Sequence, residues 1–116
     1  MSDSQLSVSA VLAALPSSDL GRSEAFYTAL LGKPVDDRPM PVLAQWRWGD
    51  FVLQVVEDAG RAGGGLLTLL VPDMAAAVAG IRDRRLPASF DAGTVVAQVA
   101  VLTDPDGNQI TLVEAR

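Results

Sequence analysis

The side chains that most often carry out chemistry in enzymes are unevenly represented in this chain. It has 14 Asp and Glu residues but no histidine and no cysteine. Nucleophilic triads usually rely on a histidine base, and transition-metal sites are built mainly from imidazole and thiolate ligands. No two carboxylates are placed across a cleft by the sequence, so acid–base catalysis has no specific signal. We therefore assign no catalytic residue.

Two segments that contain glycine deserve comparison with ligand-binding loops. The glycines at 63–65 lack the Lys and Ser/Thr of a phosphate loop and precede a strand, so a turn or hinge is expected. Residues 104–108, Asp-Pro-Asp-Gly-Asn, lack the spaced oxygen ligands of a calcium loop. They have the composition of a tight turn, because Pro presets φ and Gly tolerates positive φ.

Composition narrows the class of protein. The 116 residues suffice for one domain, and 49% hydrophobic with 20% charged residues is typical of a globular protein. A net charge of −5 disfavours nucleic-acid binding, and the arginines at 82, 84 and 85 are interpreted as a solvated helix end. No apolar run reaches the roughly 20 residues of a membrane span. The polar start, 1–7, lacks the features of a signal peptide, so a cytoplasmic location is expected.

The first half of the chain reads as strand, helix and hairpin. Residues 8–15 are an apolar run that predicts a buried strand. Ser18 or Asp19 can cap a helix that ends at Gly32, and 35–41 read as an irregular edge or loop. Residues 43–48 and 51–56 are predicted to form a hairpin joined by Gly49-Asp50. Glycine at the first position of such a two-residue turn favours type II′ geometry. This register places Trp46, Trp48, Phe51 and Leu53 on one face and Gln45, Arg47, Val52 and Gln54 on the other.

The second half repeats the pattern after a connector at 58–65. Residues 66–71 predict a buried strand, Asp73 begins a helix through about Arg85, and strands are expected at 88–91, 95–102 and 109–114. Aligning Asp19 with Asp73 superimposes two strand–helix–strand units. The fold class is therefore α+β, a single domain 1–116 of two βαβββ modules at about 8–57 and 64–115. A ferredoxin-like sandwich is the alternative, but it has too few strands between its helices.

Three segments carry a resemblance to a known family. They are Leu15 to Tyr27 near the start, Val71-Pro72-Asp73-Met74 in the middle and 104–108 at the end. Together with the two modules they resemble the vicinal oxygen chelate superfamily, which includes glyoxalase I, bleomycin resistance proteins and extradiol dioxygenases. The resemblance implies a curled mixed sheet around a cleft, with helices on its outer side.

The resemblance also implies where metal ligands would lie in the metal-dependent members. Leu12 and Leu66 stand seven residues before the two helix-opening aspartates, Thr111 stands four after the turn glycine, and Gln54 lies on the last strand of the first module. Two aliphatic side chains, a hydroxyl and an amide do not make a transition-metal site. Glu114 lies an odd number of residues from Thr111 and is expected on the opposite face. We predict neither a metal nor another cofactor.

A mostly apolar cleft with a few hydrogen-bonding groups suits a small organic ligand. Arg47 could bind an anionic group of the ligand or lie in solvent. Trp46 and Trp48 are expected in the core. If the opposite face of the hairpin lines the cleft, they would instead stack on a ligand. Phe90 is expected at the rim of the cleft. The candidate ligand-binding residues are Leu12, Gln45, Arg47, Gln54, Leu66, Thr111, Trp46, Trp48 and Phe90.

The expected function is that of a metal-free, bleomycin-resistance-like protein that binds or sequesters a small molecule. The resemblance implies a homodimer, whereas nucleic acid and membranes are not expected partners. An enzyme of the same superfamily, a lyase, isomerase or dioxygenase with an atypical metal or none, is the alternative. An interaction domain is a third reading that fold alone leaves open.

Overall fold

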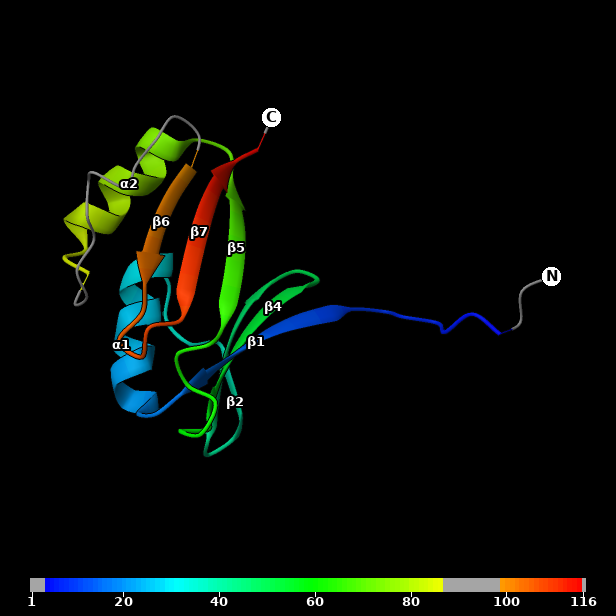
Figure 1. The fold of residues 1–116 in the computed structure, drawn as a ribbon. Helices are drawn as coiled ribbons and strands as arrows, with labels where there is room; N and C mark the ends of the chain where they lie inside the picture. Colours follow the sequence, from blue (N-terminus) through cyan, green and yellow to red (C-terminus); the bar gives the residue numbers. More distant parts are fainter. Residues whose placement is uncertain (1–3, 87–98, 116) are drawn as a thin grey trace.

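Two β-sheets and two helices make up the computed structural model, which describes residues 4–86 and 99–115 (Figure 1). The elements are β1 (Val11–Ser17), α1 (Leu20–Leu31), β2 (Asp37–Met40), β3 (Leu43–Trp48), β4 (Phe51–Glu57), β5 (Leu66–Val71), α2 (Met74–Asp83), β6 (Val99–Thr103) and β7 (Gln109–Glu114). One sheet has the strand order β1-β4-β3-β2 and the other β5-β7-β6. In each, the first strand is parallel to the last strand of its half and the remaining pairs are antiparallel. The described residues form no closed barrel.

The hairpin between β3 and β4 has the register expected from the sequence. Trp48 pairs with Phe51 and Gln45 with Gln54. Gly49 has φ of 57°, the positive value that the first position of a type II′ turn requires. The predicted division of hairpin side chains between two faces is therefore confirmed.

Both helices begin in the same way. Asp19 and Asp73 are the N-caps, and each carboxylate accepts a hydrogen bond from the backbone N–H three residues later. A glutamate from the strand that ends each half adds a second cap: Glu57 accepts from Leu20 N at 3.4 Å and Glu114 from Met74 N at 2.9 Å. The two halves thus share their capping geometry, which strengthens the repeat.

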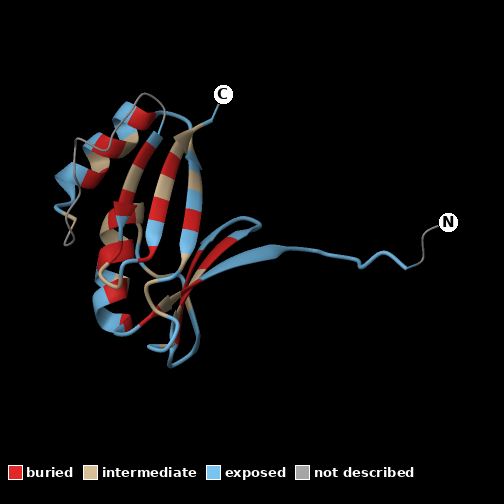
Figure 2. Cartoon of the chain, in the orientation of Figure 1, coloured by how far each residue is buried: buried red, intermediate tan, exposed pale blue. Residues whose placement is uncertain are grey.

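The core is one cluster that joins both sheets to both helices (Figure 2). Phe26 and Tyr27 of α1 are fully buried in it, in edge-to-face contact with ring centroids 4.9 Å apart. Apolar side chains on one side of β5 and β7 complete it, including Leu67, Ile110 and Leu112. Each sheet therefore has one face turned to the helices. We call the opposite face the open face, although on the first sheet Gln45 and Val52 of that face are themselves buried.

Several sequence predictions need correction. Residues 8–15 are not a buried strand: β1 begins at Val11 and runs through Pro16 to Ser17, and residues 11–14 are exposed. Only one face of β5 is buried, because helices cover one side of its sheet. The second helix ends at Asp83, two residues before the expected end. The irregular edge expected at 35–41 is confirmed, because β2 is an edge strand whose register with β3 shifts between Asp37 and Met40.

Parts of three predictions lie outside the described residues: Phe90, the strand expected at 88–91 and the first residues of the strand expected at 95–102. Within the described ranges, no helix is long and apolar enough to cross a membrane. The module boundaries and a cytoplasmic location stay predictions.

Candidate functional site

The open face of the first sheet gathers four of the candidate residues. Leu12 of β1 pairs with Val52 of β4, next to Gln54 on the same face, and Gln54 pairs with Gln45 of β3. Gln54 Nε2 donates to Gln45 Oε1 at 2.6 Å, and Gln45 is buried. The amide pair is thus fixed in an otherwise apolar stretch of strand.

Arg47 lies on the same face but already has a partner. Its guanidinium donates to the Asp37 carboxylate at 2.7 Å, and its backbone N–H donates to Asp36 Oδ2 at 2.7 Å. Hydrogen bonds from Lys33 and from this N–H lower the pKa of the Asp36 carboxyl. An anionic ligand would therefore have to compete with Asp37 for Arg47.

Leu66 and Thr111 lie on the open face of the second sheet. Thr111 pairs with Thr68, two residues beyond Leu66 on the same side of β5. Leu66 is 79% exposed, whereas Thr111 is partly buried. Glu114 points to the other face, where it caps α2, as the strand alternation predicts. The structure therefore splits the four ligand-equivalent positions between two sheets.

These positions do not fit a divalent metal. Leu12 and Leu66 have no donor atoms, and the Gln54 amide is engaged with Gln45. Within 4–86 and 99–115 there is also no group of three or more His, Cys, Asp or Glu residues close enough to hold an ion. No metal-dependent step can be built on this set of residues.

The two tryptophans have different environments. Trp46 is fully buried, with its ring centroid 6.0 Å from that of Tyr27, and its Nε1 donates to Lys33 O at 3.1 Å. Its placement in the core is confirmed. Trp48 projects to the same side beyond the end of α1 and remains 38% exposed, with Lys33 Nζ 4.9 Å from its ring centroid. The expectation that Trp48 is core is wrong, because its ring lies at the end of β3 and is only partly covered.

Trp48 borders an apolar pocket of about 780 Å³ that sequence reasoning missed. Its walls come from both halves of the chain: the outer ends of β1, β3 and β4, the last turn of α1, part of α2, and β5. Arg84 is its one charged lining residue within the described ranges. No single segment carries a signal for such a site. Its lining includes Val11, Phe51, Leu67, Leu69, Ile81 and Arg84.

Arg84 has a structural role of its own. Its guanidinium donates to the carbonyls of Ala29 and Leu30 at the end of α1. Free carbonyls at a helix C-terminus attract cations, so this arginine fastens the end of α2 to the end of α1. The interpretation of Arg84 as part of a solvated helix end is therefore incomplete.

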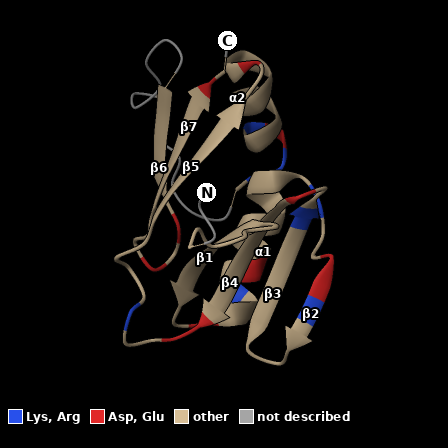
Figure 3. Ribbon diagram, turned by 90° about the vertical axis from the view of Figure 1, so that its right-hand side faces the viewer, with Lys and Arg blue, Asp and Glu red and all other residues tan. Residues whose placement is uncertain are grey.

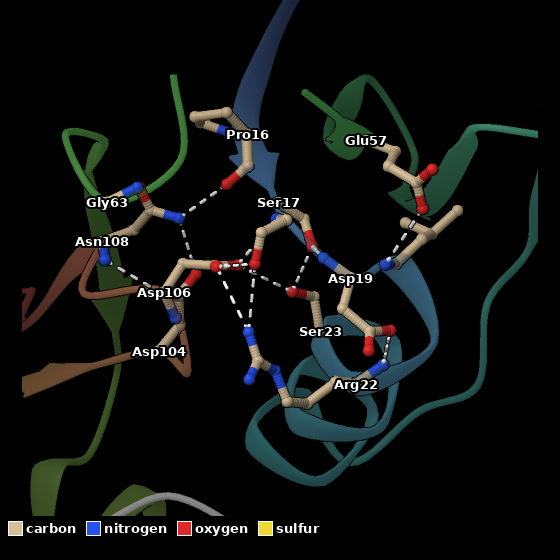
Figure 4. Close-up of polar contacts among 12 residues, drawn as sticks. Pro16, Ser17, Asp19, Arg22, Ser23, Glu57, Gly63, Asp104, Asp106 and Asn108 are labelled. Carbon is tan, nitrogen blue, oxygen red and sulfur yellow. Dashed lines mark hydrogen bonds and ion pairs between the residues drawn. The ribbon is translucent and has the colours of Figure 1, made fainter. Parts of the chain in front are cut away.

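The turn at 104–108 docks the second half of the chain onto the first (Figure 4). Asp104 is buried, and its Oδ2 accepts from Tyr27 Oη at 2.7 Å and from Asn108 Nδ2 at 2.8 Å. Its Oδ1 accepts from the backbone N–H groups of Asp106 and Asn108, each at 2.9 Å. Burial, reinforced by the hydrogen bond to Asp104 and by its charge, raises the pKa of Tyr27.

Asn108 extends this network to both halves. Its Oδ1 accepts from Gly63 N at 3.0 Å and Gly65 N at 2.7 Å, and its Nδ2 donates to Pro16 O at 2.8 Å. The side chain is fully buried, so each amide atom satisfies a group that would otherwise be unpaired. One side chain thus holds β1, the connector and the final turn together.

Asp106 attaches the same turn to the start of α1. Its carboxylate accepts from the backbone N–H of Ser18 at 3.1 Å and from the Ser18 hydroxyl, and Arg22 Nη2 lies 3.3 Å away. Burial opposes the charged form, but the Ser18 hydrogen bonds and the attraction of Arg22 prevail, so the pKa of Asp106 is lowered. In Figure 4 these side chains converge from the two halves onto one turn. The turn at 104–108, one of the three segments that carry the family resemblance, therefore holds the two halves together.

Comparison with solved structures matches this architecture. A glyoxalase/bleomycin resistance protein from Catenulispora acidiphila DSM 44928 is 29% identical, covers 92% of this chain and 98% of its own, and has a TM-score of 0.79. The chain is thus similar, in fold and over nearly its whole length, to the glyoxalase/bleomycin resistance proteins of the vicinal oxygen chelate superfamily. The resemblance inferred from the sequence is confirmed, and so is the fold class.

Two further superfamily structures share the fold at lower identity. TnmS3, an antibiotic-binding protein from Streptomyces sp. CB03234, is 24% identical, with a TM-score of 0.72 and coverage of 97% of this chain and 100% of its own. A bleomycin-binding protein complexed with bleomycin is 20% identical and has a TM-score of 0.67. The match covers 94% of this chain and 100% of that protein. No protein-family model and no curated protein matches the sequence.

Proposed function

We propose that this protein binds a small organic molecule without a metal, on the open faces of its two sheets. One observation carries the proposal. The positions at which metal-dependent members would hold their ion are Leu12, Leu66, Thr111 and a Gln54 amide that is bonded to Gln45. Such a surface offers apolar contact with a few hydrogen-bonding groups, which is the usual lining of an organic-ligand site.

Two of the structurally similar proteins support the same class of function. One is described as antibiotic-binding and another was solved with bleomycin. The net charge of −5 is compatible with a cationic ligand through long-range attraction. Arg47 does not argue for an anion, because Asp37 already neutralises it.

We also propose that the protein works as a homodimer. The candidate residues are divided between two open faces, one on each sheet, so that neither face alone encloses a ligand. Pairing one sheet with the other sheet of a second copy would supply the missing wall. This arrangement is part of the proposal and is tested separately from ligand binding.

The function is tested by a thermal-shift screen of the full chain against bleomycin, other aromatic antibiotics and small metabolites. A ligand that binds the folded state raises the melting temperature. For a hit, Thr111→Val should weaken affinity about tenfold, the effect of one lost hydrogen bond, whereas Thr28→Val on α1 should leave it unchanged.

Two results would count against the proposal. Chemical conversion of the bound compound, seen by mass spectrometry, would favour the enzyme alternative. Equal affinity of the Thr111→Val variant and the unaltered protein for every hit would remove the open face of β7 from the site.

A further inference from the structure

The two glutamines on the central strands of the first sheet have hydrogen-bonding groups to spare. Gln54 Nε2 donates to Gln45 Oε1 at 2.6 Å, which uses one N–H of the first amide and one lone pair of the second. The Gln54 carbonyl and the Gln45 NH₂ group keep their capacity. Among the described residues, no side-chain nitrogen or oxygen is buried without a hydrogen-bond partner, so these groups reach the surface of the open face. The pair therefore presents an acceptor and a donor side by side.

The residues around this amide pair are apolar. Ala14 of β1 lies opposite Gln54 in the sheet, and Val52 and Leu43 stand two residues away from the glutamines along β4 and β3. Val52 and Leu43 are each 8% exposed. In such surroundings a hydrogen bond is stronger than in water, and a polar group left unpaired is costly. The amide pair is therefore able to distinguish ligands that differ in a single polar group.

Charged side chains of the strands add no net charge to this face. Glu57 and Glu114 turn to the helices, where they accept from the first backbone N–H of α1 and of α2. Arg38 turns to the same side and forms an ion pair with a glutamate of α1. Arg47 and Asp37 remain on the open face and neutralise each other at 2.7 Å. β1, β5 and β6 contain no charged residue, as Figure 3 shows.

The open face of the second sheet has similar chemistry. Thr68 and Thr111 pair across β5 and β7. A hydroxyl, like an amide, both donates and accepts hydrogen bonds. Leu66 and Leu70 lie on the same face of β5 and are 79% and 69% exposed. The open faces of both sheets thus combine apolar contact with neutral groups that donate and accept.

We propose that the protein recognises a neutral planar group in which a C=O acceptor and an N–H donor stand side by side, as in a primary carboxamide, a lactam or a pyrimidinone ring. The ligand N–H donates to the Gln54 carbonyl, and the ligand C=O accepts from the Gln45 NH₂ group. This inference rests on the proposed binding function and names the ligand class for the same site.

Charged groups match the amide pair less well. A carboxylate has only acceptors, so it leaves the Gln54 carbonyl facing another oxygen, and an ammonium has only donors, so it leaves the Gln45 NH₂ group without an acceptor. Either ion also loses hydration without gaining an opposite charge, because Arg47 and Asp37 already neutralise each other. The net charge of −5 attracts a cationic molecule as a whole but does not select the group that meets the amides.

Benzamide, benzoate and benzylammonium test this preference on the full chain, because they share an aromatic ring and differ in the polar group. Calorimetric titration should show benzamide binding about tenfold tighter than either ion, the effect of a hydrogen bond lost against an unpaired partner. Gln45→Leu with Gln54→Leu should abolish the preference. Thr28→Val on α1 is the control and should leave it unchanged.

Gln54→Glu keeps the shape of the side chain and makes the test independent of the double variant. Its carboxylate offers only acceptors, so benzylammonium should now bind about tenfold tighter than benzamide. A preference for benzamide that survives in both variants would overturn the inference.

The remaining outcomes separate this inference from the proposals on which it depends. Equal affinities for the three compounds, or no binding of benzamide at millimolar concentration, would overturn the ligand class and leave the binding function to the antibiotic and metabolite screen. Failure of every compound in that screen would contradict the function itself. Sedimentation of the full chain measures its oligomeric state, and a monomer that prefers benzamide would contradict only the proposed homodimer.

Discussion

The phenol of Tyr27 donates a 2.7 Å hydrogen bond to the carboxylate of Asp104, which lies 77 residues later in the chain. Both side chains are buried, and the bond connects the first helix to the turn before the final strand. Tyr27 is the only tyrosine in the sequence. The conspicuous turn at 104–108 thus owes its composition to the joining of two halves, and its contribution can be measured.

Tyr27→Phe should destabilise the protein by about 1–3 kcal/mol, because it leaves a buried carboxylate oxygen with one fewer donor. Urea unfolding gives the free energy of unfolding. Thr103→Val removes a hydroxyl at an exposed position and should change stability by less than about 0.5 kcal/mol. Equal effects of the two substitutions would show that the bond to Asp104 contributes nothing specific.

Asp106 should make stability depend on pH. Its pKa is lowered in the folded state, so the folded protein binds fewer protons than the unfolded chain in acid. The stabilisation is present above the ordinary carboxyl pKa of about 4 and is lost as pH falls through the lower, folded value. Melting temperatures between pH 7 and pH 3 should fall less steeply for Asp106→Asn. Parallel curves would contradict the assignment.

Gly65→Ala should destabilise by about 1–3 kcal/mol through overpacking. An added Cβ would lie 2.6 Å from Leu15 Cδ2 and 2.8 Å from Asn108 Oδ1, both in buried side chains. Gly60→Ala in the same connector is the matched control, since its nearest neighbour would be 3.7 Å away. Chemical denaturation should separate the two variants clearly. A Gly65→Ala protein as stable as the Gly60→Ala one would show that the junction is loosely packed.

The amide pair on the open face can be dissected by a double-mutant cycle. Gln54→Leu alone should cost about 1 kcal/mol, because the buried Gln45 carbonyl loses its donor. Gln45→Leu with Gln54→Leu should recover most of that loss, since both polar partners are replaced. If a ligand from the screen uses these amides, its affinity should fall in the double variant although stability is restored. Additive losses of stability would contradict the pairing.

Purified protein should contain no stoichiometric Zn, Ni, Fe or Mn. Leu12, Leu66, Thr111 and the engaged Gln54 give an ion too few donors to hold it against water. Elemental analysis after growth in metal-supplemented medium measures this, and a metal-dependent superfamily protein prepared in parallel is the control. One tightly bound equivalent per chain would refute the metal-free proposal.

Local features of the fold were predictable because they depend on neighbouring residues. Asp19 and Asp73 mark both helix starts, since their carboxylates accept from nearby N–H groups. Gly49 fixed the hairpin turn, and strand alternation then placed Gln45 opposite Gln54 and Glu114 away from Thr111. Burial was predicted less well. The apolar runs that contain Leu12 and Leu66 looked like core, yet helices cover only one face of each sheet.

Alternation and local motifs along the sequence determined the helices, most of the strands, the hairpin register and the caps, because these follow from short-range hydrogen bonding and periodicity. The resemblance to a superfamily came separately, from three short segments of the sequence. Tertiary structure alone decided that Asp104 meets Tyr27, that Asn108 satisfies the connector, and that Trp48 borders a pocket built from both halves. It also decided which apolar strands stay uncovered. Those outcomes depend on how two sheets pack around one helix layer, a long-range arrangement that no single segment encodes.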